Sequence, residues 1–364
     1  MTGLDDPRTD DRAEPRRARL AWVEPPDRVG FGSLVALMVA NTVAAVGLAG
    51  DIASHVSFAV TLDDDDFLSG WHLVLYSGIA GAAVVIGLLA VQRDPRAPVR
   101  MLPTATAGVA TLTVGGAADA IWHEVFGVEA ALQALVSPPH LLIFMGLVLL
   151  MVAPIGALAD GPNRPLDPVH SLVLALSVTS LLLVISLFTG YLTPLIGGSQ
   201  FQAGAYTEPL IGTSLLDYDI SRSLGVALWF SVLMSVVVVG IRARTAPVAG
   251  TWTVSFGLLG LAPPLAALSS PTGSSTWTGP LPLTAALVTY GLLSDLTATR
   301  ARPHPAATGV AVAAMWTVMF LLVGARGDLV WVRELWAGII TTGFLVGGTV
   351  GAGARWLSAA PRDG

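Results

Sequence analysis

Cysteine is absent from this chain of 364 residues, and charged residues are scarce, at 12%. Without thiols the chain cannot form disulfides, iron–sulfur clusters or thiolate metal sites. Soluble domains carry about 25% charged residues, so this chain has too few to cover a water-facing surface. It also lacks a P-loop, an HExxH motif, a nucleophile elbow and any nucleic-acid-binding signature, so we expect no nucleic-acid partner.

Apolar residues make up 53% of the chain and gather in long runs. A helix needs about 20 such residues to cross roughly 30 Å of hydrocarbon. Only helices satisfy their own backbone hydrogen bonds there, and the runs lack the alternation of a membrane barrel. The sequence therefore predicts an all-α, multi-pass protein of the cell membrane, embedded in the lipid bilayer, with about ten transmembrane helices. The predicted spans are 33–57, 71–92, 103–123, 139–159, 170–190, 222–241, 247–268, 280–297, 307–325 and 335–355.

The basic residues, all of them arginine, indicate the orientation of these spans. Cytoplasmic loops of membrane proteins are enriched in basic residues. With the N-terminus inside, sixteen of the 19 basic residues fall on the cytoplasmic side. Only Arg222, Arg326 and Arg333 fall outside. We therefore expect both termini to be cytoplasmic.

Four regions are expected along the chain. Residues 1–30 are polar and lack the apolar region of a signal peptide, so they predict a disordered cytoplasmic tail. Residues 31–160 predict a four-helix membrane module. Residues 161–358 predict a six-helix membrane region that carries no interpretable motif, and residues 359–364 a second cytoplasmic tail.

The four-helix module contains a tandem repeat whose two copies align without a gap. The stretch GLAGDIASHVSF from Gly47 aligns with GGAADAIWHEVF from Gly115, and LSGWHLVLYSG from Leu68 aligns with VSPPHLLIFMG from Val136 at the same offset. Each copy is a pair of helices, so the two copies have the same orientation in the membrane. The pattern D-x3-H-x16-H occurs in both copies, as Asp51, His55 and His72 and as Asp119, His123 and His140.

These six residues are candidate metal ligands. The carboxylate and the first imidazole of each copy lie one helical turn apart on one face. A second imidazole opens the next helix, so all three groups converge near the outer membrane boundary. Imidazole suits zinc, copper, iron and nickel, and a carboxylate compensates the charge of the ion. Three protein ligands also leave one coordination position for water or substrate. Two mononuclear sites and one dinuclear site are both compatible with the pattern.

Two other interpretations of the Asp–His pattern stay open. The pairs could be buried ion pairs that hold helices together, or they could form a proton relay, since ionisable residues within spans often mark such paths. The remaining polar residues of note, which are Glu124, His170, His304 and the acidic run 63–66, are expected to be solvated.

The triad D-x3-H followed by a histidine on the next helix resembles the metal-binding pattern in the C subunit of the membrane-bound copper monooxygenases, the methane and ammonia enzymes. The resemblance covers Asp51, His55 and His72, and equally the matching triad of the second copy. It implies that these residues bind copper within the membrane.

The first functional hypothesis is therefore a membrane metalloprotein that binds copper or zinc near the extracytoplasmic face. Such a centre would support oxidoreductase or hydrolase chemistry on a small-molecule or lipid substrate, and whether the chain is an enzyme stays open. The alternative is a transporter that uses the same residues for a metal ion or a proton; a local unwinding at Pro263 and Pro264 would favour it. A third hypothesis is a structural membrane protein with packed histidines.

Overall fold

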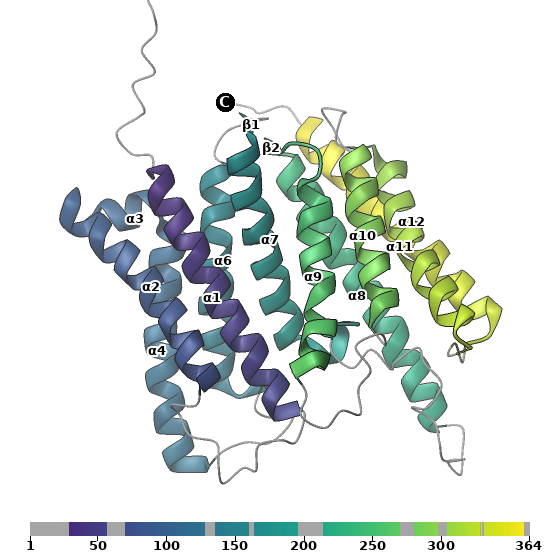
Figure 1. Cartoon of the computed structure of the whole chain (residues 1–364), viewed down its shortest axis with the longest axis horizontal. Helices are drawn as coiled ribbons and strands as arrows, with labels where there is room; N and C mark the ends of the chain where they lie inside the picture. The colour runs from purple at the N-terminus through teal and green to yellow at the C-terminus, as the bar shows by residue number, and fades with distance from the viewer. Residues whose placement is uncertain are drawn as a thin grey trace, which may run out of the picture.

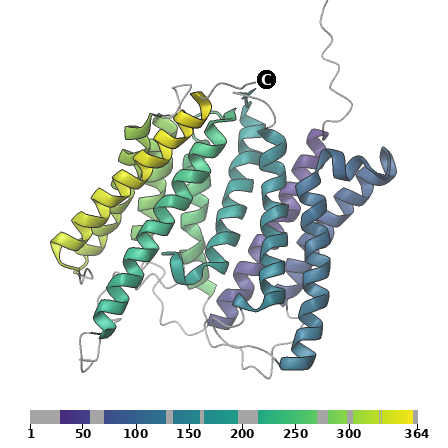
Figure 2. The ribbon, with the colours of Figure 1, turned by 180° about the vertical axis from the view of Figure 1, so that it is seen from behind.

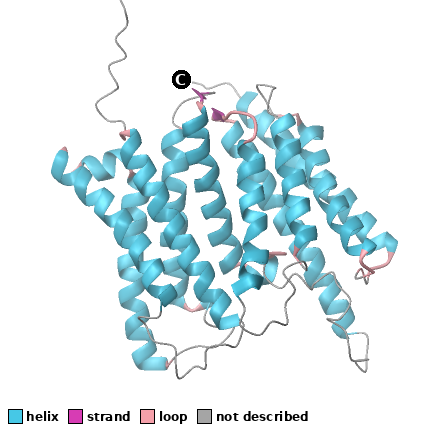
Figure 3. Cartoon of the chain, viewed as in Figure 1, coloured by secondary structure: helices cyan, strands magenta, loops and turns pink. Residues whose placement is uncertain are grey.

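The computed structural model describes residues 29–56, 70–127, 135–159, 164–195, 214–269, 280–297, 304–327, 329 and 331–359. Helix dominates this part of the chain (Figure 3). Its helices are α1 (Phe31–Val56), α2 (Gly70–Gln92), α3 (Ala97–Met101), α4 (Pro103–Phe126), α6 (Pro138–Leu158), α7 (Pro168–Phe188), η2 (Gly190–Leu192), α8 (Ser214–Arg242), α9 (Thr251–Ser269), α10 (Leu281–Leu296), α11 (Pro305–Ala325) and α12 (Arg333–Ala359).

The apolar runs of the sequence form the long helices. Each of the ten predicted spans coincides with one of these long helices. Within the described residues, seven segments are long and apolar enough to cross a membrane, and the protein is an all-α, multi-pass membrane bundle. These segments are Phe31–Ala53, Gly70–Gln92, Pro138–Leu158, Pro168–Phe188, Ser223–Arg242, Pro305–Ala325 and Arg333–Trp356.

The helices run up and down in one bundle (Figures 1 and 2). α1 packs mainly on α2, and α4 mainly on α6. α7 contacts α1, α6 and α9 and is the most buried of the candidate spans. α10 lies between α9 and α11, and α8 contacts α11 and α12. The start of α1 and the end of α12 lie at the same end of the bundle (Figure 1).

The α1–α2 and α4–α6 pairs meet at glycines that occupy equivalent positions in the two copies of the repeat. A Cβ added to Gly47 of α1 would clash with the backbone of Leu75 in α2. The equivalent Gly115 of α4 faces Ile143 of α6, where an added Cβ would lie 3.1 Å from the backbone nitrogen. Both glycines therefore let the backbones of the paired helices approach closely.

The second helix of each pair contributes a matching glycine. A Cβ on Gly78 of α2 would clash with the backbone of Ala44 in α1, and one on Gly146 of α6 would lie 3.0 Å from the nitrogen of Leu112 in α4. Ala44 and Leu112 are themselves equivalent in the alignment of the two copies. The two helix pairs thus use the same close contacts, which fix the relative height of the two helices in each pair.

A proline inside α6 leaves one backbone carbonyl without its helical donor, and α1 supplies a replacement. Pro154 has no N–H group, so it cannot bond the carbonyl four residues earlier, at Leu150. The side-chain amide of Asn41 in α1 donates to this carbonyl over 2.9 Å. Asn41 is fully buried. In a bilayer such a freed carbonyl has no water to bond, so the asparagine satisfies it from the neighbouring helix.

The same arrangement recurs between α9 and α10. Pro264 frees the carbonyl of Gly260, and the hydroxyl of Thr284 in α10 donates to it over 2.6 Å. α9 consequently continues as a helix from Thr251 to Ser269 through both Pro263 and Pro264. The local unwinding that would have favoured a transport site at these prolines is not found.

Two buried charges tie α8, α9 and α10 together at the end of the bundle where α1 begins. Asp295 of α10 accepts the backbone N–H groups of Trp252 and Thr253, at 3.2 and 2.8 Å, in the first turn of α9. Arg242 of α8 donates to the carbonyl of Thr297, at 2.6 Å, where α10 ends. The carboxylate therefore caps the N-terminus of α9, and the guanidinium caps the C-terminus of α10. Each charge is tolerated inside the bundle because it faces a helix end of opposite polarity.

A short parallel pairing was not predicted from the sequence. β1 (Arg164–Pro165) pairs with β2 (Thr245–Ala246) and joins the α6–α7 and α8–α9 connections. Two-residue strands are too short to show an alternating pattern, so the sequence gives no signal for them.

We expect the contact between Asn41 and the Leu150 carbonyl to depend on Pro154. Replacing Pro154 by alanine restores the helical N–H donor, so Asn41→Leu should destabilise the Pro154→Ala protein by about 1 kcal/mol less than the parent. A double-mutant cycle of unfolding free energies measures this coupling. Thr113→Val is the control, because the Thr113 hydroxyl bonds only its own helix, at Val109, and should give the same change in both backgrounds. Equal effects of Asn41→Leu in both backgrounds would contradict the assignment.

Candidate metal centre

The second copy of the repeat brings its three candidate ligands together at one end of the α4–α6 pair. Asp119 and His123 lie one turn apart near the end of α4, and His140 lies in the first turn of α6. α4 ends at Gly127, whose φ of 79° few other residues adopt. α6 begins after Ser137 with two prolines, which suit the first turn because they lack the N–H groups that have no helical partner there.

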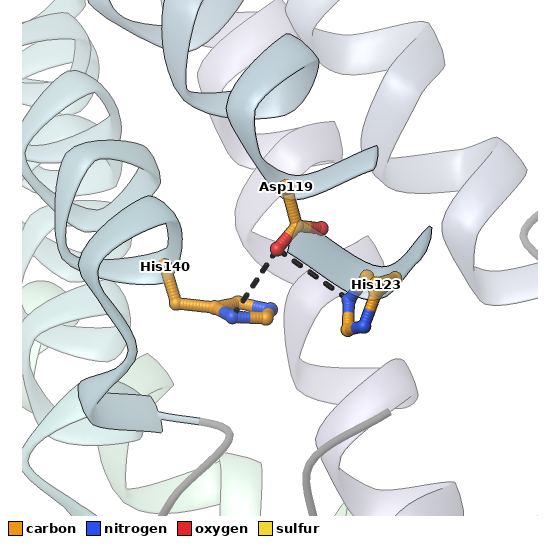
Figure 4. A group of neighbouring side chains, drawn as sticks. All are labelled: Asp119, His123 and His140. Carbon is orange, nitrogen blue, oxygen red and sulfur yellow. Dashed lines mark ion pairs between the residues drawn. The ribbon is translucent and has the colours of Figure 1, made fainter. Parts of the chain in front are cut away.

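The three side chains point toward one another (Figure 4). Oδ1 of Asp119 lies 3.5 Å from Nε2 of His123 and 3.4 Å from Nδ1 of His140. One ligand atom from each residue can be chosen so that all three lie within 4.8 Å of one another. Asp119, His123 and His140 form the only group of three acidic or histidine side chains, among the described residues, that lie close enough to hold one ion.

The two distances from Asp119 are compatible with ligands of a shared ion. Two atoms that each lie about 2.0–2.1 Å from a tetrahedral ion are about 3.3–3.4 Å apart. Good N–H···O hydrogen bonds span about 2.7–3.2 Å. The two distances from Asp119 exceed the second range and lie close to the first.

One oxygen of the Asp119 carboxylate is buried and has no hydrogen-bond donor among the described residues. The residue is only 9% exposed, and its Oδ1 atom accepts no hydrogen bond from the described part of the protein. An unsatisfied buried carboxylate oxygen is costly, so a cation or a proton is needed at this position. His123 and His140 are the groups that face it.

A contact with the carbonyl of Gly127 bears on the tautomer of His123. Nδ1 lies 3.3 Å from the carbonyl oxygen of Gly127, which can only accept, so this contact favours the tautomer with the proton on Nδ1. In the neutral ring Nε2 then presents a lone pair toward the carboxylate of Asp119. Two acceptors facing each other indicate either a metal ion between them or a second proton that makes the ring an imidazolium.

The first copy shows the equivalent contact. Oδ1 of Asp51 lies 3.3 Å from Nε2 of His72, whereas the equivalent pair, Asp119 and His140, meets at 3.4 Å through the other ring nitrogen, Nδ1. His55 belongs to α1, one turn after Asp51, but its side chain lies outside the described residues. The structure thus brings together two of the three predicted ligands in this copy.

The other polar candidates lie apart from the centre. Glu124 is exposed near the end of α4 and His304 is exposed just before α11. Nδ1 of His170 lies 2.8 Å from the carboxylate of Asp167, which also caps α7. The backbone N–H of His170 and its ring lower the pKa of Asp167. The acidic run 63–66 lies outside the described residues.

Sequence reasoning missed two groups that contact the histidines. They are the carbonyl of Gly127 and the hydroxyl of Ser137, which lies 2.7 Å from Nδ1 of His140. Serine occurs at equivalent positions of the two copies, Ser69 and Ser137, and this identity was a signal for the Ser137 hydroxyl. A backbone carbonyl leaves no such signal, because any residue supplies one.

Asp119→Asn distinguishes a metal site from a structural ion pair. If the site is built for an ion, the metal-free carboxylate is a liability, and asparagine, whose amide can donate to Nε2 of His123, should leave the melting temperature unchanged or raise it. Thermal unfolding of the chelator-treated protein measures this. A clear loss of stability in the metal-free variant would instead identify an imidazolium–carboxylate pair. His304→Ala serves as a control for a histidine outside the centre.

Comparisons of the chain with protein-family models, with curated proteins and with solved structures find no match. The resemblance to the copper monooxygenase subunit therefore stays a prediction from the ligand pattern. What the protein does is inferred from its own residues.

Proposed function

We propose that this protein is a membrane metalloprotein that binds a divalent transition metal, copper or zinc, near the extracytoplasmic face. The observation that supports the proposal best is the convergence of Asp119, His123 and His140 around a buried carboxylate oxygen that has no hydrogen-bond donor among the described residues. All three groups are ordinary ligands of such ions.

The arginine distribution supports the proposed orientation, with ten spans and both termini in the cytoplasm. Arg93, Arg96, Arg100, Arg244 and Arg355 belong to or adjoin the helix ends on the side where α1 begins. Asp119 and His140 lie toward the opposite end of the bundle, in the last turns of α4 and the first turn of α6. The positive-inside rule then gives the metal sites an extracytoplasmic location.

Two mononuclear sites are favoured over one dinuclear site. Asp119 meets His140 within the α4–α6 pair, and Asp51 meets His72 within the α1–α2 pair. The equivalent glycine contacts of the two pairs support a common origin of the two sites. We propose Asp51, His55 and His72 as the ligands of the first site and Asp119, His123 and His140 as those of the second.

The donor set favours zinc or divalent copper over softer ions. It contains two imidazoles and a carboxylate, and the chain has no thiol. Three ligands leave a coordination position for water or a substrate oxygen, as catalytic zinc sites do. A bound zinc ion would supply Lewis-acid and hydrolytic chemistry, and copper would supply redox chemistry. Because His123 and His140 keep 28% and 26% of their side-chain surface exposed, a small molecule or a lipid headgroup could reach that position.

The transporter hypothesis has less support. Transport sites usually lie near the bilayer midplane at broken helices. Here the candidate ligands lie close to helix ends, and α9 continues through its two prolines.

Metal analysis of the full-length protein tests the proposal. After purification and loading with zinc or copper, the wild-type chain should retain about two ions, and the His123→Ala/His140→Ala double variant about one, since each site has three ligands and the second loses two of them. His170→Ala/His304→Ala is the matched control, with two histidines removed outside the proposed sites. Equal metal content in the wild type and the His123/His140 variant would remove the second site, and no retained metal in either would remove the proposal.

A further inference from the structure

The hydroxyl of Ser137 occupies an unusual position at the start of α6. Ser137 is the residue before the first helical turn, where a serine side chain ordinarily accepts a backbone N–H of that turn. It makes no such capping bond. Its Oγ lies instead 2.7 Å from Nδ1 of His140, and the residue is only 6% exposed.

The direction of this hydrogen bond follows from the partners that are present. His140 Nδ1 is the hydrogen-bond partner of Ser137 Oγ in the described part of the protein. A buried hydroxyl that donates to Nδ1 uses its proton, whereas one that only accepts would leave that proton without a partner, which is unfavourable. A donating Ser137 leaves Nδ1 of His140 as the unprotonated nitrogen.

That nitrogen is also the one that faces the carboxylate. Nδ1 of His140 lies 3.4 Å from Oδ1 of Asp119, and Nε2 of His123 lies 3.5 Å from the same oxygen. Nδ1 of His140, Nε2 of His123 and one carboxylate oxygen thus meet at one point, and the Ser137 hydroxyl lies beside Nδ1 of His140. The hydroxyl proton takes the place on Nδ1 that a metal ion would take.

We infer that Ser137 competes with the metal for His140 and thereby sets the affinity of the centre. This inference rests on the proposed function and adds to it a residue that tunes the same site. Metal binding must break the Ser137–His140 hydrogen bond, which then frees the hydroxyl beside the ion. Ser137 weakens metal binding, in contrast to the usual partner of a ligating histidine, which strengthens it.

The test is the zinc dissociation constant of the full-length protein, measured by competition with a chromophoric chelator. Ser137→Ala should bind zinc about two- to tenfold more tightly than the wild type, the range that one net hydrogen bond represents. Ser137→Thr keeps the hydroxyl and should stay close to the wild type. Ser177→Ala is the matched control, because that buried serine bonds only its own helix, at Val173.

A metal-free readout tests the same hydrogen bond. Nitrogen-15 NMR of histidine-labelled apoprotein should show His140 protonated at Nε2 in the wild type, and a loss of that preference in Ser137→Ala. Weaker zinc binding by Ser137→Ala, or unchanged binding together with an unchanged tautomer, would overturn the inference. If the wild type binds neither zinc nor copper, the proposed function fails and the inference with it. If it binds metal and only the serine prediction fails, the proposed function stands.

Discussion

Close packing of two helices at glycine is the constraint on which the candidate centre depends. A carboxylate on one helix and an imidazole on the next can lie 3.4 Å apart only if the two helices pack closely near these residues. Gly115 and Gly146 remove the side chains that would hold α4 and α6 apart. Since Asp119 lies one turn beyond Gly115 on the same face of α4, the glycine contact also determines where the carboxylate meets its partner.

The bilayer imposes a second constraint, because a polar group buried in it cannot be satisfied by water. Pro154 of α6 and Pro264 of α9 would each leave a carbonyl exposed to hydrocarbon, and a polar side chain from a neighbouring helix bonds each of these two carbonyls. Buried Asp295 is satisfied by the N–H groups of α9. Several buried polar atoms of the described residues have no hydrogen-bond partner, and Oδ1 of Asp119 is one that two histidines also face. The convergence of the two histidines on this oxygen, and not the missing donor alone, is what distinguishes it from the others.

Much of this arrangement could be predicted from the sequence. Apolar runs of about 20 residues predict helices because no other structure satisfies the backbone in lipid, and the observed helices coincide with them. The tandem pattern predicted that Asp119, His123 and His140 would meet, since i, i+4 spacing and a hairpin leave few other arrangements. The involvement of Ser137 and of the Gly127 carbonyl could not be predicted, because rotamers and loop-end dihedral angles decide those contacts. The partner of Asn41 was equally hidden, since it is a backbone carbonyl far along the chain, at Leu150.

Both hairpins, α1–α2 and α4–α6, enter and leave the bundle at the same end (Figure 1). A unit with an even number of spans can be inserted or copied without reversing any helix that follows it. An extra copy of a single helix would turn the remainder of the chain upside down and place its arginines on the wrong side of the bilayer. Duplication of a whole hairpin therefore leaves the orientation of all other helices unchanged. Each added hairpin would also place its carboxylate and imidazoles at the same membrane surface.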